Sequence, residues 1–230
     1  MKKTLWIAIA GALAASAIAA SAQEVLSANA VGYIKKTLPA NGKLIALSAP
    51  LNSMTESSIV FGRTSIAQEA PQGSWVYFWD PALQGWSGGS ESGKGWGGAQ
   101  SNKVIASGEA FFMKGNPADA VAREITITGE VPDDAALARA IPGGNALGTI
   151  GNPFPVDFKF GTSSIASNAT QGSWVYFWDE ALQGWSGGSK SGKGWGGAQS
   201  NRVVLAAEGF FLKEAGTLNM WTNSKPYTWP

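Results

Sequence analysis

The sequence predicts an all-β protein made of two tandem, pseudo-symmetric repeats, each a small β-sandwich or barrel. The first observation is a duplication: residues 72–103 return as residues 171–202, shifted by 99 positions, and 29 of the 32 positions are identical. The second is a series of short apolar runs separated by turn residues, which is typical of β-proteins. The third is the scarcity of helical patterns, because only residues 133–140 are compatible with a helix.

Residues 1–22 have the features of a secretory signal peptide. Lys2 and Lys3 precede an apolar run, and Ala20-Ser21-Ala22 forms a small-residue cleavage site. A membrane anchor is the alternative, but the run is rich in alanine and shorter than the roughly 20 strongly apolar residues that span a bilayer. We therefore expect cleavage after residue 22, a first repeat over 23–130 and a second over 131–230. The mature chain, with no transmembrane segment, is expected to be extracellular, at the cell surface or periplasmic.

Composition argues against several classes of partner. Without Lys2 and Lys3 the chain has 15 basic and 16 acidic residues, so no excess of positive charge favours nucleic acid. The chain has no cysteine, so an exported fold must be stabilised by packing without disulfides. Each repeat, at about 100 residues, is long enough to bury a core.

The opening of each repeat contains one or two predicted strands. Residues 25–33 suggest an edge strand that ends near Gly32, and residues 38–42 a turn. The apolar run 43–51 follows and matches 146–154 in the second repeat. These two runs are offset by 103 residues, so the second repeat must lack four residues in the loop that follows.

The duplicated segment begins with the most apolar predicted strand, residues 74–79. Alternation places Trp75, Tyr77 and Trp79 on one face and Val76 and Phe78 on the other. Such a strand belongs inside a covered sheet, or its aromatic face is a binding surface. Residues 80–85 predict a hairpin connection, Trp86 opens the return strand, and the Gly/Ser-rich residues 87–102 predict a loop.

The remaining elements are short. Residues 104–105 and 108–114 predict strands, with 208–213 as the counterpart of the latter, and residues 124–130 alternate as a half-buried strand does. Residues 133–140 predict a short connecting helix, with acidic residues at its start. The tail 220–230 predicts a last strand.

The motifs KLIALSAPLN, VYFWDPALQGW and GEAFFMK, together with the openings LPANGKLIALSAPLN and IPGGNALGTIGNPFP, carry a family resemblance. They resemble two-repeat secreted β-proteins that are abundant in verrucomicrobial bacteria. The resemblance covers nearly the whole mature chain and implies a modular β-fold. It supplies no catalytic residue. The second repeat departs from the motif, since Gly151-Asn152 stands where Ser48-Ala49 stands in the first.

Enzymatic motifs are weak. Residues 88–94 and 187–193 match a phosphate-binding loop, but a glycine replaces the required Ser or Thr and no helix follows, so no nucleotide is expected. Histidine is absent, which removes the usual triads and nearly all zinc sites. Two carboxylate pairs, Asp80 with Glu109 and Asp179 with Glu208, are the alternatives for a glycan hydrolase. Their simpler interpretation is structural, and no cofactor or metal is expected.

Tryptophan is the strongest remaining signal. Most of these residues lie in predicted strands, where core packing is the usual role. Two stand alone among Gly and Ser, so an exposed indole beside polar neighbours predicts a binding loop in each repeat. The alternative is that each indole covers its own core. The candidate binding residues are Lys94, Trp96, Gln100 and Asn102 in the first loop, and Lys193, Trp195, Gln199 and Asn201 in the second.

These observations predict a non-enzymatic, exported protein with a structural or adhesive role, whose loops contact other copies or an extracellular surface. The alternative is a bivalent carbohydrate-binding protein that stacks polysaccharide on the loop tryptophans, since two weak sites on one body gain by avidity. A glycan hydrolase is a distant third.

Overall fold

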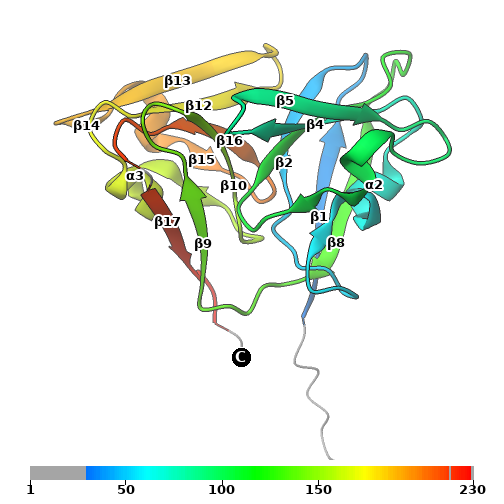
Figure 1. Ribbon diagram of the computed structural model, residues 1–230, viewed down its shortest axis with the longest axis horizontal. Coiled ribbons are helices and arrows are strands. Elements are labelled where there is room, and N and C mark those ends of the chain that lie inside the picture. Colours follow the sequence, from blue (N-terminus) through cyan, green and yellow to red (C-terminus); the bar gives the residue numbers. More distant parts are fainter. Residues whose placement is uncertain (1–29, 218, 229–230) are drawn as a thin grey trace, which may run out of the picture.

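A computed structural model describes residues 30–217 and 219–228, and within them the all-β prediction is confirmed. Figure 1 shows two groups of strands side by side, with β9 and β17 in the left group and β1 and β8 in the right group. The expected signal peptide and the start of the first predicted strand lie outside the described residues. No helix in the described part of the chain is long and apolar enough to cross a membrane.

Residues 30–217 and 219–228 build six sheets of antiparallel strands. The first half contains a four-stranded sheet in the order β2-β7-β4-β5, the ribbon β1-β8 and the short pair β3-β6. Its strands are β1 (Val31–Leu38), β2 (Leu44–Ser48), β3 (Ile59–Val60), β4 (Trp75–Asp80), β5 (Gly85–Ser90), β6 (Val104–Ile105), β7 (Ala110–Lys114) and β8 (Arg123–Glu130).

The second half has a five-stranded sheet in the order β10-β16-β12-β13-β14, the ribbon β9-β17 and the pair β11-β15. Its strands are β9 (Ala136–Ile141), β10 (Leu147–Gly151), β11 (Phe158–Lys159), β12 (Trp174–Asp179), β13 (Gly184–Ser191), β14 (Gly194–Trp195), β15 (Val203–Val204), β16 (Gly209–Lys213) and β17 (Asn219–Ser224).

Short helices cover one end of each sheet. They are η1 (Phe61–Arg63), α2 (Ser65–Glu69) and η2 (Gly98–Asn102) in the first half, and η3 (Phe160–Thr162), α3 (Ser164–Asn168) and η4 (Gly197–Asn201) in the second. The hydroxyls of Thr64 and Ser163 cap α2 and α3 by accepting from the N–H groups of Ala67 and Ala166. Sequence reasoning missed these helices because they are only five residues long.

The inner face of each large sheet builds a core. In the first half Val76 and Phe78 of β4 are buried against Phe61 and Phe111, and the ring centroids of Phe61 and Phe78 lie 5.4 Å apart. The equivalent residues of β12, Val175 and Phe177, pack in the second core. The strand predicted over residues 74–79 therefore lies inside its sheet, between β7 and β5, but the sheet is not covered on both faces, since Trp75 on the outer face is 38% exposed.

Three predictions of local structure are wrong. The first strand does not end near Gly32, because β1 runs from Val31 to Leu38. Residues 133–140 contain no helix, and 136–141 form strand β9, which pairs with β17. Leu137 and Arg139 alternate with exposed alanines along β9, so the period is that of a strand, and pairing outweighs the helical preference of alanine. The Gly/Ser-rich residues 87–102 are not one loop either, because β5 continues to Ser90 and η2 begins at Gly98.

The two halves also contact each other through hydrogen bonds of the main chain and of one serine side chain. Ser48 N–H donates to Ala207 O, Gly151 N–H donates to Gly108 O, and Ser48 Oγ donates to Asn152 O. A side chain on Gly209 would place its Cβ 2.5 Å from the Cβ of Ala110, and one on Gly151 would lie 2.4 Å from the Cβ of Ser48. Glycine is therefore required at both positions, because the strands approach too closely for any larger residue.

Gly209→Ala is expected to lower the free energy of unfolding by about 1–3 kcal/mol, the usual cost of forcing an extra methyl group into a packed contact. Gly192→Ala is the matched control, because a Cβ at Gly192 meets nothing within 4 Å. Urea unfolding followed by tryptophan fluorescence measures both variants. Equal stability of the two variants would contradict the close approach.

Candidate functional site

The two loop tryptophans do not face solvent. Trp96 and Trp195 are each only 8% exposed, and their indole N–H groups donate to Ala67 O and Ala166 O, each at 2.9 Å. Trp96 packs edge-on against Phe61, with ring centroids 4.9 Å apart. The prediction of exposed binding indoles is therefore wrong, and these residues cover the cores of their own halves. The loops fold back because each indole finds both apolar partners and a carbonyl acceptor there.

The other predicted loop residues do not assemble into a site. Gln100 and Gln199 are buried beneath the sheet edge, where a Cβ on Gly89 would lie 2.9 Å from Cγ of Gln100. The exposed members of the set do not surround either tryptophan as binding partners. They are Lys94, Asn102, Lys193 and Asn201.

The exposed aromatic residues lie instead on the outer faces of the large sheets. Trp86 and Trp185 are each 46% exposed, and Trp75 and Trp174 are 38% and 41% exposed. All four point to the face opposite the core, in line with the alternation of β4, β5, β12 and β13. Sequence reasoning raised an aromatic binding face for residues 74–79 but assigned Trp86 and Trp185 to strand packing.

The outer faces meet at the junction of the halves. Phe112 of β7 stacks on Phe211 of β16, with centroids 6.3 Å apart and planes 24° apart. Trp86 lies edge-on to both phenylalanines, at 5.4 Å and 5.7 Å, and Trp185 contacts both at 5.6 Å and 5.2 Å. These four rings form the centre of the junction, and part of each indole stays in solvent.

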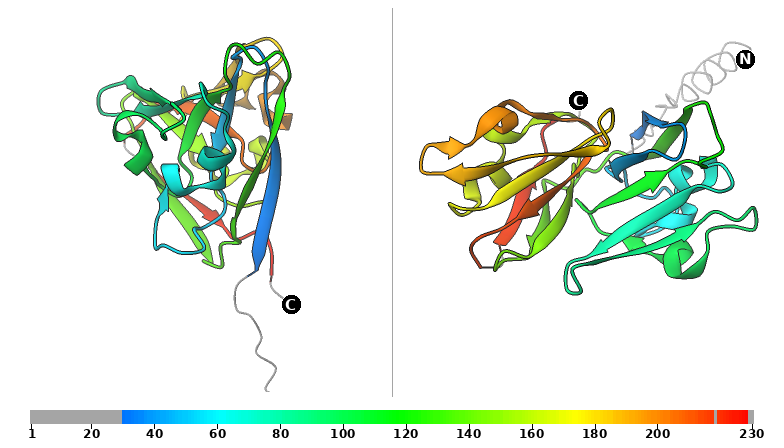
Figure 2. Two further views of the ribbon diagram at one scale, coloured as in Figure 1. Left: turned by 90° about the vertical axis from the view of Figure 1, so that its right-hand side faces the viewer. Right: turned by 90° about the horizontal axis from the view of Figure 1, so that it is seen from above.

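The tip of each hairpin binds the first strand of the other half's large sheet. Trp79 Nε1 donates to Leu147 O at 2.8 Å, and Trp178 Nε1 donates to Leu44 O at 3.0 Å. Figure 2 shows the teal β4-β5 hairpin and the yellow β12-β13 hairpin both ending at the boundary between the halves.

The amide side chains beside these tips act in the same reciprocal way. Gln84 accepts from Leu147 N–H and donates to Leu147 O, whereas Gln183 does the same with Leu44. Each hairpin is thus held by an indole and an amide, which fixes the orientation of the aromatic residues behind it.

The outer faces that carry Trp75, Trp86, Trp174 and Trp185 together form the aromatic face. Two hollows lie on it. The larger, about 530 Å³, has Tyr77 and Phe112 of the first half and is closed by Trp178 and Trp185 of the second. The smaller, about 380 Å³, has the reverse composition: Tyr176 and Phe211 belong to the second half, and Trp79 and Trp86 to the first. Trp86 and Trp185 line both hollows, so they form the ridge between them.

The floor of the larger hollow is a flat aromatic surface. Tyr77 covers Gly88, since a Cβ there would lie 2.8 Å from Cδ1 of the ring. Trp75 and Tyr77 are nearly parallel, with centroids 6.1 Å apart, and the Lys114 ammonium lies 5.6 Å and 5.8 Å from their centroids. Gly187 and Tyr176 repeat this contact in the smaller hollow, and Trp174 stacks beside Tyr176.

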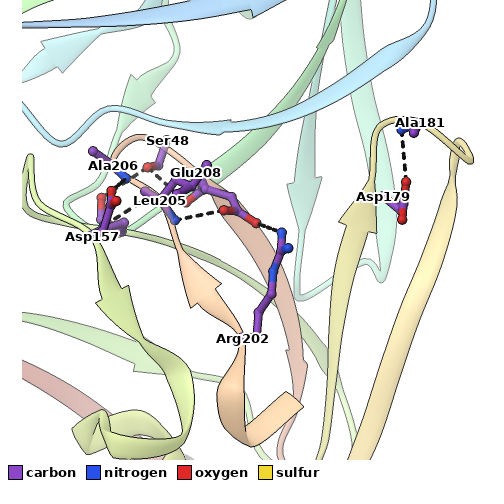
Figure 3. A network of polar contacts seen from close by, with 9 residues as sticks. Ser48, Asp157, Asp179, Ala181, Arg202, Leu205, Ala206 and Glu208 are labelled. Carbon is purple, nitrogen blue, oxygen red and sulfur yellow. Dashed lines mark hydrogen bonds and ion pairs between the residues drawn. The ribbon is translucent and has the colours of Figure 1, made fainter. Parts of the chain in front are cut away.

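The carboxylates considered for catalysis hold turns. Asp80 Oδ1 accepts from Ala82 N–H and Leu83 N–H, and Asp179 Oδ1 accepts from Ala181 N–H and Leu182 N–H. Figure 3 shows Asp179 at the end of its strand, apart from the Glu208 network.

The glutamates of the two pairs have a similar structural role. Glu208 Oε2 accepts from Leu205 N–H while Oε1 pairs with Arg202 at 2.5 Å, and Glu109 accepts from Ala106 N–H beside Lys103. These bonds close the turns that precede β16 and β7.

A charged hollow of about 320 Å³ is lined by Asp179, Glu180, Arg202 and Glu208, so the second predicted carboxylate pair shares one hollow. Burial raises the pKa of Glu180 above its ordinary value and Glu208 adds to the rise, while Lys36 and Arg202 act in the opposite direction. Among the described residues no group of three or more His, Cys, Asp or Glu side chains is arranged to hold a metal ion.

Trp96→Ala and Trp195→Ala are each expected to lower the free energy of unfolding by about 3–5 kcal/mol, the usual cost of deleting a large buried ring. Leu83→Ala is the control, since Leu83 is 80% exposed at a hairpin tip. Urea denaturation checks the difference. A loss below about 1 kcal/mol in the tryptophan variants would contradict the buried placement.

Comparisons with protein-family models, with curated proteins and with solved structures found no match to this chain. Function must therefore be inferred from the geometry itself.

Proposed function

We propose that this protein is an exported, non-enzymatic carbohydrate-binding protein that uses the aromatic face at the junction of its halves. One observation carries the proposal. Two hollows of similar composition each combine a tyrosine-covered floor from one half with two tryptophans from the other. The expected signal peptide at residues 1–22 supports export.

A sugar ring matches these surfaces chemically. The C–H face of a pyranose is apolar and flat, and it stacks on the negative face of an indole or phenol ring. The hollows have the volume of small-ligand sites, which begin at about 300 Å³. Lys114 and the tyrosine hydroxyls supply polar groups at the edges of the aromatic floor, where sugar hydroxyls would project.

The ridge of Trp86 and Trp185 favours a polymeric ligand over a single sugar. A chain that crosses the ridge would contact both hollows in one binding event, and the second contact would benefit from a high effective concentration. Because the hairpin tips are fixed by Trp79, Trp178 and the two glutamines, both hollows are preorganised.

The other functions expected from the sequence receive less support. An adhesive or structural role through the Gly/Trp loops relied on Trp96 and Trp195, which are buried. Hydrolysis relied on Asp80, Glu109, Asp179 and Glu208, whose oxygens bond to turn N–H groups. Carbohydrate binding without catalysis uses the aromatic residues that line the two hollows.

Trp86→Ala and Trp185→Ala are each expected to weaken binding to both hollows by about fivefold, because each removes a stacking surface worth on the order of 1 kcal/mol. Isothermal titration calorimetry with hexasaccharides of neutral β-linked glucan, xylan and mannan measures this. Leu182→Ala is the control, since Leu182 is 81% exposed and lines neither hollow.

Single tyrosine variants sharpen the test. Tyr77 lines only the larger hollow and Tyr176 only the smaller, so each alanine variant should lose one class of site and retain the other. Thermal unfolding of each variant shows whether the fold survives. Unchanged affinity in a folded Trp86→Ala/Trp185→Ala double variant, or no binding to any of the three glycans, would overturn the proposal.

A further inference from the structure

Two strand edges in the described structure lack a partner. β5 is the last strand of the first large sheet and bonds only to β4 over residues 85–89. β13 bonds to β14 at Lys190 and Ser191, but residues 184–188 have no neighbour on that side. The residues Trp86, Ser87 and Gly88, and likewise Trp185, Ser186 and Gly187, are exposed.

The alternating direction of the main-chain N–H and C=O groups shows which of them have no partner in the sheet. Glu91 bonds to Ser74 and Gly73 on the β4 side, whereas Ser90 O accepts from Gly97 on the other side. Alternation along the strand then turns the N–H and C=O groups of Gly88 and Trp86 away from β4. In β13 the same argument applies, since Ser189 O accepts from Gly196 N–H and the outward residues are Gly187 and Trp185.

Within residues 85–90 and 184–189 no side chain guards these edges. Natural edge strands carry lysine, proline, bulges or inward charges that prevent pairing with another chain. The sequence of both stretches is GWSGGS, which has neither charge nor proline, and its glycines let a second backbone approach closely.

We propose that the free edges of β5 and β13 bind a second copy of this chain by antiparallel strand pairing centred on Ser87 and on Ser186. The edge is complementary to itself. In this register Trp86 of one copy exchanges both main-chain hydrogen bonds with Gly88 of the other, and Gly88 exchanges both with Trp86.

Side chains permit the same register. The Trp86 indole leans inward over its own sheet, against Trp79 and Phe112, so it leaves the free edge open. Gly88 of the second copy has no side chain to clash there, and within its own sheet Gly88 is covered by Tyr77, since a Cβ would lie 2.8 Å from the ring. Aromatic cover of a strand glycine is a recognised stabilising pair.

The pairing has a consequence for assembly. Each molecule carries two edges of the same sequence, so a molecule bound through β5 still presents β13. Closed dimers form if one partner engages both edges, and open chains form if it does not. Either outcome is concentration-dependent and distinct from sugar binding, which uses side chains of the hollows.

Charged residues introduced at the centre of the paired strands test the proposal. Ser87 faces Ser87 of the second copy in a pair with Cα atoms about 4.5 Å apart, where like charges repel strongly. Sedimentation velocity from micromolar to millimolar concentration should show assembly of the wild type. Ser87→Asp/Ser186→Asp and Ser87→Lys/Ser186→Lys should each remain monomeric, and an equimolar mixture of the two should assemble.

Variants of both negative and positive charge are needed, because nearby basic residues attract an introduced aspartate and offset its repulsion. Lys103 lies 5.7 Å from the ring of Phe78, the cross-strand partner of Ser87, and Arg202 lies 5.4 Å from Phe177, the partner of Ser186. Thr55→Asp/Ser57→Asp is the control, since it adds the same charge on an exposed segment away from either edge and should assemble like the wild type.

Assembly that persists in both charged variants, or a monomeric wild type at millimolar concentration, would overturn the strand pairing. A mixture that stays monomeric would do the same. The monomeric variants also separate the two proposals, because they retain Trp86, Trp185 and both tyrosines. Their affinity for the glycan hexasaccharides is expected to match that of the wild type within about twofold.

Discussion

The stack of Phe112 on Phe211 is the contact on which the rest of the junction depends. It brings together the outer faces of two sheets that would otherwise present aromatic side chains to water. Trp79, Trp86, Trp178 and Trp185 then pack around it, and the hairpins that carry them are fastened to the opposite half. The hollows exist because these rings fill the centre of the junction but not its flanks.

Much of the fold follows from local patterns. Apolar runs bounded by turn residues locate β4 and β7, and a two-residue alternation locates β8, because such periods and glycine or proline boundaries have direct physical meaning. Residues 136–141 favour a helix locally because they are rich in alanine, while the decisive interaction, pairing with β17, comes from residues 78 to 88 positions away. The helices α2 and α3 depend on a cap and a single turn, which composition does not reveal.

The site was harder to infer than the fold. An isolated tryptophan among glycines seems exposed in sequence, but Trp96 finds Phe61 and Ala67 O only after the chain folds back. Conversely, Trp86 stands in a strand and suggests a core residue. Its exposure depends on two sheets meeting at an angle that leaves its flank open, which is a property of tertiary packing that no local pattern encodes. The structural role of the paired carboxylates, by contrast, follows from turn chemistry.

The close approach of Gly209 to Ala110 and of Gly151 to Ser48 bears on how such a molecule arises. In each pair the two residues occupy corresponding positions of the two repeats, so the junction brings each position against its own equivalent. Two identical half-molecules with alanine or serine there would collide, and two with glycine would lose the side-chain contact. Joining the halves in one chain permits a small residue on one side and a larger one on the other, an asymmetry that a homodimer encoded by a single repeat has no means to acquire.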